Sequence, residues 1–371
     1  MKDIVKLGTL GDIFIGLTYR PEDVANEGTI VLRSSNIQNG KLDFADIVRV
    51  KCKVRENLIV KPNDILMCSR NGSAKLVGKC TLLPKMDEEM SFGAFMTIIR
   101  TQHNPYLVHF FNSNAFRGQL GSAATTTINQ ITRRMLDDIS VPLYPKEQED
   151  YIVSLFNQID ELIWTETQKL ELFDELVKSR FIELFGDPNT NPMKWKKEPL
   201  QINATLLNGR AYKQDELLDD GKYPVLRVGN FFSNRGWYYS DLELDEDKYC
   251  DDGDLLYAWS ASFGPRIWNG GKVIYHYHIW KVLVGEKYNK QFLCHLLDYA
   301  TASFMGDTHG IGMMHLTKSG MEETEFIVPP IDLQNQFAAF VEQTEKSKMV
   351  VQRSIAELEE VKKSLMQKYF G

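Results

Sequence analysis

The chain has 371 residues, of which 43% are hydrophobic and 25% charged, so it is long enough for two or three ordinary globular domains. No apolar run reaches the roughly 18 residues of a membrane span, and the first sixteen residues lack the apolar core of a secretory signal, so we expect neither. The five cysteines are scattered and form no Cys-x-x-Cys pair, which argues against a zinc site or a disulfide framework and favours a reducing cytoplasm.

The net charge of −7 is distributed unevenly along the chain. Residues 1–146 carry 19 basic and 14 acidic side chains, a balance of +5, whereas residues 147–186 carry 3 and 10, a balance of −7. Residues 187–330 carry 15 and 20, a balance of −5, and residues 331–371 are neutral. Because phosphate contacts depend on local basic faces, the acidic total does not exclude DNA binding, although we expect the second domain to bind DNA weakly alone.

Residues 1–146 predict a mixed, strand-rich domain, with short β-type runs at 30–33, 65–68 and 95–99 and a short helix at 106–119. A helix of about 38 residues follows at 147–186, with apolar side chains in alternating steps of four and three. This heptad spacing is typical of a helix that packs against a partner helix. Eight of the ten stripe positions are apolar, and the stripe consists of Ile152, Phe156, Ile159, Ile163, Glu166, Leu170, Phe173, Val177, Arg180 and Leu184. Gly186-Asp187-Pro188 ends the helix.

Residues 187–330 predict a second strand-rich domain, with β-type runs at 225–228 and 255–259 and a helix at 289–302. Residues 273–280 alternate in character, which predicts one strand with His276 and His278 on the same face. Residues 331–371 predict a second long helix, whose stripe is the first stripe shifted by 185 positions. Seven of its ten positions are apolar, and it consists of Phe337, Val341, Thr344, Lys348, Val351, Ile355, Leu358, Lys362, Leu365 and Tyr369.

The two halves repeat one another in motif as well as in order. Val31-Leu32-Arg33 returns as Val225-Leu226-Arg227, Asp64-Ile65-Leu66 as Asp254-Leu255-Leu256, and Phe185-Gly186 as Phe370-Gly371. The fold class is therefore α+β: two strand-rich mixed domains joined by two long helices that form an antiparallel coiled coil, a tandem repeat with pseudo-two-fold symmetry. The ordinary alternative is a two-helix element inside a larger domain, but helices of about 38 residues are far longer than the usual 11 or 12.

Specific motifs mark the ends of the two long helices. The first helix begins at Glu147-Gln148, contains Lys178-Ser179-Arg180-Phe181, and exits through Phe-Gly-Asp-Pro at 185–188, Asn191-Pro192 and Trp195. The second opens with Pro-Pro-Ile-Asp-Leu-Gln-Asn-Gln-Phe at 329–337. With these motifs the chain resembles the specificity subunits of Type I restriction–modification systems. The resemblance covers the whole chain, is most specific in the helices, and departs where Tyr144-Pro145-Lys146 stands in place of Pro330-Ile331-Asp332.

This resemblance implies four segments: target-recognition domain 1 at 1–146, a central helix at 147–186, target-recognition domain 2 at 187–330 and a C-terminal helix at 331–371. Each recognition domain would bind one half of a split double-stranded DNA target, and the helices would fix the gap. Two adenine-methyltransferase subunits and restriction translocase–nuclease subunits would be the partners. Catalysis would belong to those partners, with S-adenosylmethionine and ATP bound there and no cofactor in this chain.

The sequence itself contains no recognisable catalytic motif. Gly270-Gly271-Lys272 lacks the remaining residues of a phosphate-binding loop, and there is no His-Glu-x-x-His. His276 and His278 could suit a metal, but no carboxylate motif accompanies them, so we expect neither a catalytic nor a metal site.

Candidate DNA-binding residues follow the paired Asp-Ile-Leu and Asp-Leu-Leu strands. Arginine can bind guanine through two hydrogen bonds, asparagine can bind adenine, and serine lets the backbone approach phosphate. These candidates are Arg70, Asn71, Ser73, Lys75, Ser260, Ser262, Arg266 and Trp268, with a second set at Thr125, Asn129, Thr308 and His309. Solvated loops are the ordinary alternative, and turn stabilisation explains Asn36 and Asn230 as well as base contact does. Since the candidate segments of the two halves differ, we expect an asymmetric, bipartite target.

Other functions stay open at this point. The chain could be the recognition subunit of a combined cutting-and-methylating restriction enzyme, a silent variant cassette, or a coiled-coil assembly protein with no DNA role. The exposed acidic face of the first helix, at Glu161, Glu171, Asp174 and Glu175, is a candidate docking surface, although a solvated charged face is the ordinary expectation.

Overall fold

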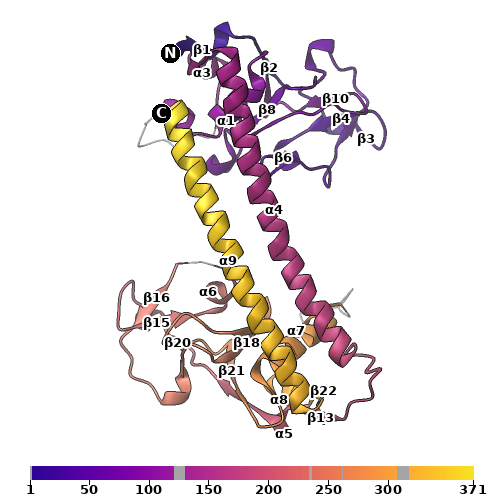
Figure 1. The fold of residues 1–371 in the computed structure, drawn as a ribbon, viewed down its shortest axis with the longest axis vertical. Helices are drawn as coiled ribbons and strands as arrows, with labels where there is room; N and C mark the ends of the chain where they lie inside the picture. The colour runs from indigo at the N-terminus through magenta and orange to yellow at the C-terminus, as the bar shows by residue number, and fades with distance from the viewer. Residues whose placement is uncertain (1, 121–129, 234–235, 261, 307–316) are drawn as a thin grey trace. The chain divides into compact units, whose positions relative to one another are not determined.

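The computed structural model describes residues 2–120, 130–233, 236–260, 262–306 and 317–371 (Figure 1). Contacts divide the chain into two units, which we describe separately. Unit 1 combines Met1–Thr167 with Gln352–Gly371, and unit 2 is Gln168–Val351. The four predicted domain boundaries remain a prediction, because each contact unit joins one predicted recognition domain to parts of both long helices.

The described residues of unit 1 form three sheets and a short hairpin. A two-stranded sheet pairs β1 (Asp3–Lys6) with β12 (Ser140–Leu143). The next has the order β2 (Asp12–Ile15), β11 (Met96–Arg100), β8 (Ile65–Cys68) and β9 (Cys80–Leu82). The third has the order β10 (Met90–Phe92), β4 (Thr29–Leu32), β7 (Arg49–Val50) and β3 (Val24–Ala25), and the hairpin is β5 (Ile37–Gln38) with β6 (Lys41–Leu42). Its short helices are α1 (Asn104–Phe111), α2 (Asn114–Gln119) and α3 (Arg133–Asp137).

The described residues of unit 2 repeat most of this arrangement, although the strand order of the third sheet differs. Its two-stranded sheet pairs β13 (Lys197–Pro199) with β22 (Glu325–Ile327). The second sheet has the order β14 (Ala204–Asn208), β21 (Ile279–Val284), β18 (Leu255–Ser260) and β19 (Ser262–Ile267). The third has the order β16 (Tyr238–Ser240), β15 (Tyr223–Leu226), β20 (Val273–Tyr275) and β17 (Tyr249–Cys250). Its short helices are α5 (Leu200–Asn203), α6 (Val228–Phe232), α7 (Lys290–Gly306) and α8 (Lys318–Glu323).

The strand pairings confirm the internal repeat. In unit 1 the parallel pair is β4 with β10, and in unit 2 it is the corresponding β15 with β20. The order β2-β11-β8-β9 matches β14-β21-β18-β19 strand for strand. The predicted α+β class is therefore correct.

Both faces of the central strand in each unit are buried, which explains its uninterrupted apolar sequence. In β8, Ile65 and Met67 join one core cluster while Leu66 and Cys68 join another. The corresponding strand β18 divides in the same way, with Leu255 and Tyr257 in one cluster and Leu256 and Ala258 in the other.

The two long helices are α4 (Lys146–Phe185) and α9 (Ile331–Phe370), and parts of both belong to each unit. Within unit 1 they run antiparallel, since the ring of Phe156 stacks on Phe370 at a centroid distance of 5.9 Å and Lys362 pairs with Asp160. Within unit 2, Phe181 meets Phe337 at 5.4 Å and the Lys348 ammonium lies 2.8 Å from Asp174.

The predicted stripe lies on the inner side of each helix pair. Every apolar stripe residue is buried or half-buried: Ile152, Phe156, Ile159, Ile163, Leu170, Phe173, Val177 and Leu184 on α4, and Phe337, Val341, Val351, Ile355, Leu358, Leu365 and Tyr369 on α9. Within the described ranges, no helix is long and apolar enough to cross a membrane.

The motif that follows α4 closes the C-terminal end of the helix. Gly186 has a φ of +72°, a conformation that glycine adopts without steric cost, and its N–H donates to the carbonyl of Ile182 at 2.8 Å. The Trp195 indole N–H donates to the carbonyl of Phe185 at 2.9 Å, and the Asn191 amide bonds both backbone groups of Trp195. Gly186 and Trp195 therefore satisfy two of the free carbonyls of the last turn, and Asn191 holds Trp195 in place.

Two predicted elements are interrupted in the structure. The helix expected at 106–119 is divided into α1 and α2, because the Ser113 hydroxyl accepts the N–H of Phe116 at 3.3 Å and starts a new helix. The single strand expected at 273–280 is wrong. It is divided into β20 and β21, which belong to different sheets, and residues 276–278 form the connection between them.

Candidate DNA interface

The Asp-Ile-Leu and Asp-Leu-Leu motifs begin with matching turns. Asn63 has a φ of +64° and Gly253 a φ of +87°, so both turns need a residue that tolerates the left-handed region. The Asp64 carboxylate accepts the N–H of Lys61 at 2.8 Å, and the Asp254 carboxylate accepts the N–H of Asp251 at 2.9 Å. Both aspartates therefore fix the start of the central strand.

A buried ion pair strengthens the first of these turns. The guanidinium of Arg100 donates to both oxygens of Asp64, at 2.8 and 2.6 Å, and the Asp64 side chain is only 1% exposed. The carboxylate also raises the pKa of Arg100 through the hydrogen bonds it accepts. In unit 2 the corresponding pair is Lys281 with Asp254 at 2.7 Å.

The end of β8 presents Arg70 at the surface. The N–H groups of Ser69 and Arg70 both donate to the carbonyl of Phe95, at 2.9 and 3.1 Å. The Arg70 guanidinium lies 5.4 Å from the ring centre of Phe95, which is itself 58% exposed. An arginine held over an exposed ring keeps its N–H groups available for a nucleic-acid acceptor.

Of the other candidates in this loop, Asn71 stabilises the loop by hydrogen bonds, whereas Ser73 and Lys75 are exposed to solvent. The Asn71 amide donates to the Ser34 hydroxyl at 3.2 Å and accepts the N–H of Ser73 at 2.9 Å, which forms an Asx turn. Ser73 and Lys75 are exposed. The structure thus brings Arg70, Ser73 and Lys75 to one loop, where a phosphate backbone could approach.

In unit 2 the equivalent segment lies where β18 pairs antiparallel with β19. Ser260 and Ser262 face each other across its end, half-buried and exposed respectively. Arg266 is exposed, and its guanidinium donates to the carbonyl of Phe231 while lying 6.0 Å from that ring.

The prediction for Trp268 needs correction. Its side chain is only 5% exposed, it belongs to a core cluster of unit 2, and its indole N–H donates to the carbonyl of Gly271 at 2.7 Å. A buried indole with a satisfied N–H stabilises the domain and offers no face to DNA. Thr125, Asn129, Thr308 and His309 lie outside the described residues.

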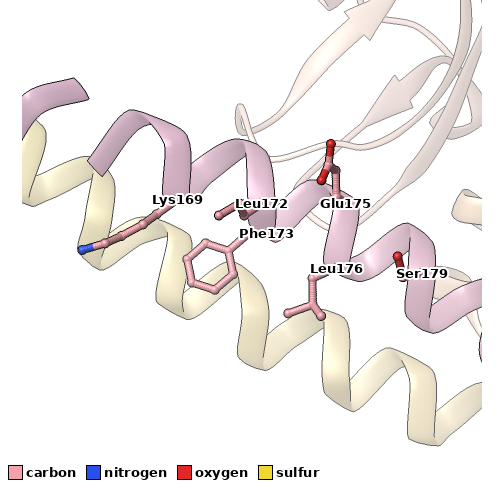
Figure 2. Close-up of a pocket in the computed structure, with 6 residues that line it drawn as sticks. All are labelled: Lys169, Leu172, Phe173, Glu175, Leu176 and Ser179. Atoms are coloured by element: carbon pink, nitrogen blue, oxygen red, sulfur yellow. The ribbon is translucent and has the colours of Figure 1, made fainter. Parts of the chain in front are cut away.

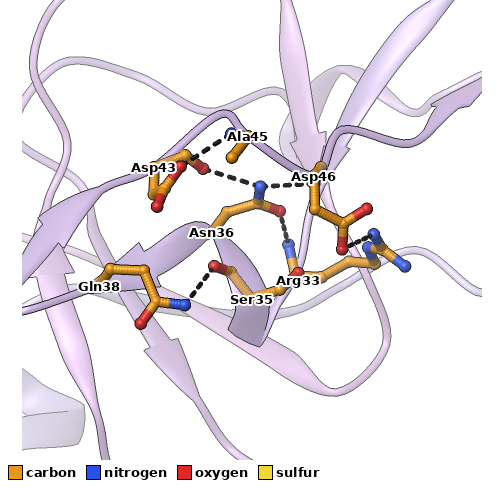
Figure 3. Close-up of polar contacts among 7 residues, drawn as sticks. All are labelled: Arg33, Ser35, Asn36, Gln38, Asp43, Ala45 and Asp46. Carbon is orange, nitrogen blue, oxygen red and sulfur yellow. Dashed lines mark hydrogen bonds and ion pairs between the residues drawn. The ribbon is translucent and has the colours of Figure 1, made fainter. Parts of the chain in front are cut away.

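Asn36 has a structural role, which Figure 3 shows. The side chain is fully buried, its oxygen accepts the N–H of Arg33 at 2.8 Å, and its amide donates to the carbonyls of Asp43 and Asp46, each at 2.9 Å. The repeat-equivalent Asn230 also bonds to a loop, since its amide donates to the carbonyl of Gly236 at 3.2 Å. For Asn36, turn stabilisation is therefore the correct alternative.

A shallow apolar groove lies along α4 beside acidic residues. Figure 2 shows the groove in unit 2, lined by Lys169, Leu172, Phe173, Glu175, Leu176 and Ser179. Leu172 is 61% exposed and Leu176 is 47% exposed. The predicted acidic residues Glu161, Glu171, Asp174 and Glu175 are all exposed. Asp174 is engaged by Lys348, so the acidic face is partly neutralised within the chain.

Comparison with known proteins agrees with this architecture. A family model described as the Type I restriction modification DNA specificity domain matches residues 193–360. The chain is 28% identical to the Type I restriction enzyme EcoKI specificity subunit of Escherichia coli (strain K12), over 69% of this chain and 60% of that protein. It is 24% identical to the StySPI specificity subunit of Salmonella potsdam, over 91% of this chain and 80% of that protein.

Two solved structures share the fold. A chain from a study of complex assembly and conformational transition of the type I R-M system aligns with a TM-score of 0.63 and 16% identity, over 100% of this chain and 97% of that chain. The S subunit of a Type-I restriction-modification system from M. genitalium aligns with a TM-score of 0.55 and 15% identity, over 100% and 96%. The family model matches residues 193–360, a little under half of the chain. In sequence and fold, the chain is therefore similar to the specificity subunits of Type I restriction–modification systems.

Proposed function

We propose that this chain determines the DNA sequence specificity of a Type I complex by binding a bipartite, asymmetric target. Residues 1–146 would bind one half-site and residues 187–330 the other. The observation that carries the proposal is the duplicated framework with different side chains at matching positions. Ser69-Arg70 directly follows β8, whereas the matching Trp259-Ser260 ends β18, and Arg70 is exposed where Ser260 is half-buried. Two similar frames with dissimilar surfaces are what an asymmetric target requires.

We further propose that α4 and α9 set the gap between half-sites. Both helices are continuous over 40 residues, and their apolar stripes face one another inside each unit. Removing one heptad from each helix shortens each by about 10 Å. The gap in the target should then shrink by up to about three base pairs, with both half-sites retained. An unchanged gap would refute this role of the helices.

The partners in this proposal are two adenine-methyltransferase subunits and restriction translocase–nuclease subunits. The apolar groove at Leu172 and Leu176, bordered by Glu175, supports a protein docking surface on α4, since exposed apolar side chains next to charge are typical of an interface. The chain itself would be non-catalytic and would bind no cofactor, whereas S-adenosylmethionine and ATP would bind the partners.

Methylome sequencing tests the proposal most directly. The full chain is expressed with its neighbouring methyltransferase gene in a methylation-free host, and methyl-adenine is mapped at base resolution. We expect one split, asymmetric motif. If a soluble complex with the methyltransferase leaves the genome unmethylated, the chain is not an active specificity subunit. Co-purification with a single fused nuclease–methyltransferase would instead identify a combined cutting-and-methylating enzyme.

A further inference from the structure

A three-residue turn joins corresponding strands in the two units. In unit 1, Gly93-Ala94-Phe95 connects β10 to β11, and in unit 2, His276-Tyr277-His278 connects β20 to β21. The end of the central strand holds each turn by the same backbone hydrogen bond. The N–H of Ser69 donates to the carbonyl of Phe95 at 2.9 Å, and the N–H of Trp259 donates to the carbonyl of His278 at 3.0 Å.

At each turn the backbone packs closely against a glycine from an earlier part of the same unit. A Cβ atom at Gly16 would lie 2.1 Å from the carbonyl oxygen of Gly93, and one at Gly209 would lie 2.4 Å from that of His276. Matching parallel bridges, Leu17 with Gly93 and Arg210 with His276, complete the correspondence. The backbone contacts that hold the two turns are therefore the same, although the side chains of the turns differ at all three positions.

The turn in unit 2 carries a surface cluster of aromatic rings. The Tyr277 ring, 39% exposed, lies 3.9 Å from His278 and 4.5 Å from His276, and Trp259 lies 5.0 Å from His278. The Trp259 indole N–H donates to the carbonyl of Tyr277 at 2.9 Å, and Tyr212 stacks on His276 at 6.3 Å. These contacts hold the rings in place before any ligand binds, which lowers the entropy lost on binding.

The protonation of His276 follows from its surroundings. Its Nδ1 accepts the N–H of His278 at 3.4 Å, which assigns the ring proton to Nε2. Burial, together with the nearby His278 and Arg227, lowers the pKa of His276 to about 4. The half-buried imidazole is therefore neutral at pH 7 and offers one N–H donor. A neutral N–H donor lacks the charge that favours phosphate, so it is better suited to hydrogen-bond an acceptor on a base edge.

We propose that these two turns are the positions at which each recognition domain discriminates the bases of its half-site. In unit 2, His276 donates to a major-groove acceptor, which is carried by purines at N7, by guanine at O6 and by thymine at O4, while Tyr277 contacts the neighbouring base edge. In unit 1, Phe95 of the turn contacts a thymine methyl group, and Arg70, which lies over the Phe95 ring from the end of β8, binds guanine. The inference rests on the proposed function and adds to it the residues that set specificity.

The test transfers one turn into the other frame. The variant carries His276→Gly, Tyr277→Ala and His278→Phe together, is expressed as the full chain with the methyltransferase, and is assayed by methylome sequencing. We expect the first half-site to stay unchanged and the second to lose discrimination about 10- to 100-fold at one or more base pairs. Leu283→Ala is the matched control, since Leu283 is 45% exposed near the other end of the same strand, β21. It should leave the motif intact.

Each outcome decides one of the two claims. A wild-type complex that methylates no split motif refutes the proposed function, and the inference with it. A wild-type motif that persists unchanged in the turn variant refutes the inference alone. If the triple variant does not co-purify with the methyltransferase, Tyr277→Ala replaces it, because this exposed side chain can be truncated without opening a core. An unchanged second half-site in that variant refutes the proposal equally.

Discussion

Truncation of Phe156 tests how unit 1 holds its two long helices. The side chain is fully buried on α4, and its ring lies 5.0 Å from His109 of α1, 5.9 Å from Phe370 and 6.4 Å from Tyr369 of α9. Phe156→Ala removes all three ring contacts at once and leaves a cavity. A buried phenylalanine truncation costs about 3 to 5 kcal/mol, so we expect a loss of about 4 kcal/mol from the stability of unit 1.

The assay must resolve one unit from the other, because a single unfolding free energy is not defined for a chain that opens in parts. Hydrogen exchange read by mass spectrometry does so. A loss of about 4 kcal/mol should accelerate the exchange of α1 and the last turns of α9 by nearly three orders of magnitude. Peptides from α7, in unit 2, should keep their rates.

Tyr151→Ala is the control, since Tyr151 lies on the same helix and is 60% exposed. An exposed truncation should change stability by no more than about 0.5 kcal/mol. The reasoning is refuted if the two variants exchange alike. It is also refuted if Phe156→Ala accelerates exchange in α7 as much as in α1, because the two contact units would then open together.

Three further predictions concern single positions. Arg100→Ala leaves the carboxylate of Asp64 buried without its partner and should destabilise unit 1 by about 3 kcal/mol, measured by the same exchange experiment. Burial lowers the pKa of His109 from 6.5 to about 4, so its contribution to stability is complete above pH 6.5 and is lost as the pH falls toward 4. His109→Phe should flatten that decline, which amounts to up to about 3 kcal/mol, and equal slopes in both proteins would contradict this. Gly209→Ala should displace the turn at His276 and impair methylation of the second half-site, whereas Gly236→Ala, with open space around it, should not.

The long helices and the repeat could be predicted from the sequence because their signals are periodic and local. The apolar stripe from Ile152 to Leu184 follows from heptad spacing, and burial of its partner stripe on α9 places both on the inner side. The repeated aspartate at Asp64 and Asp254 was recognisable from spacing alone. Its role as a turn acceptor required the hydrogen bonds of the structure.

The candidate DNA surface was less predictable, since exposure in a loop depends on tertiary packing. Trp268 resembled a surface aromatic in its polar segment, but it fills the core of unit 2. Alternation between 273 and 280 suggested one strand, because residues on both sides of the break keep a period of two. No local pattern separates β20 from β21. Gly209, against which the turn at His276 packs, lies far from that turn in the sequence. The role of this glycine could be inferred from the sequence only by comparing the two repeats.

Under the proposed function, divergent specificity would be compatible with a retained fold, because different residues would carry the two. The frame depends on buried groups such as Asp64, on backbone hydrogen bonds, and on the glycines that permit close approach. The side chains of the two turns do not form these contacts, and Phe95 and Tyr277 are 58% and 39% exposed. Exchanging an exposed side chain changes stability little, whereas it replaces a donor, an acceptor or an apolar contact outright. Under the proposed function, one half-site would therefore be free to change while the fold and the other half-site persist.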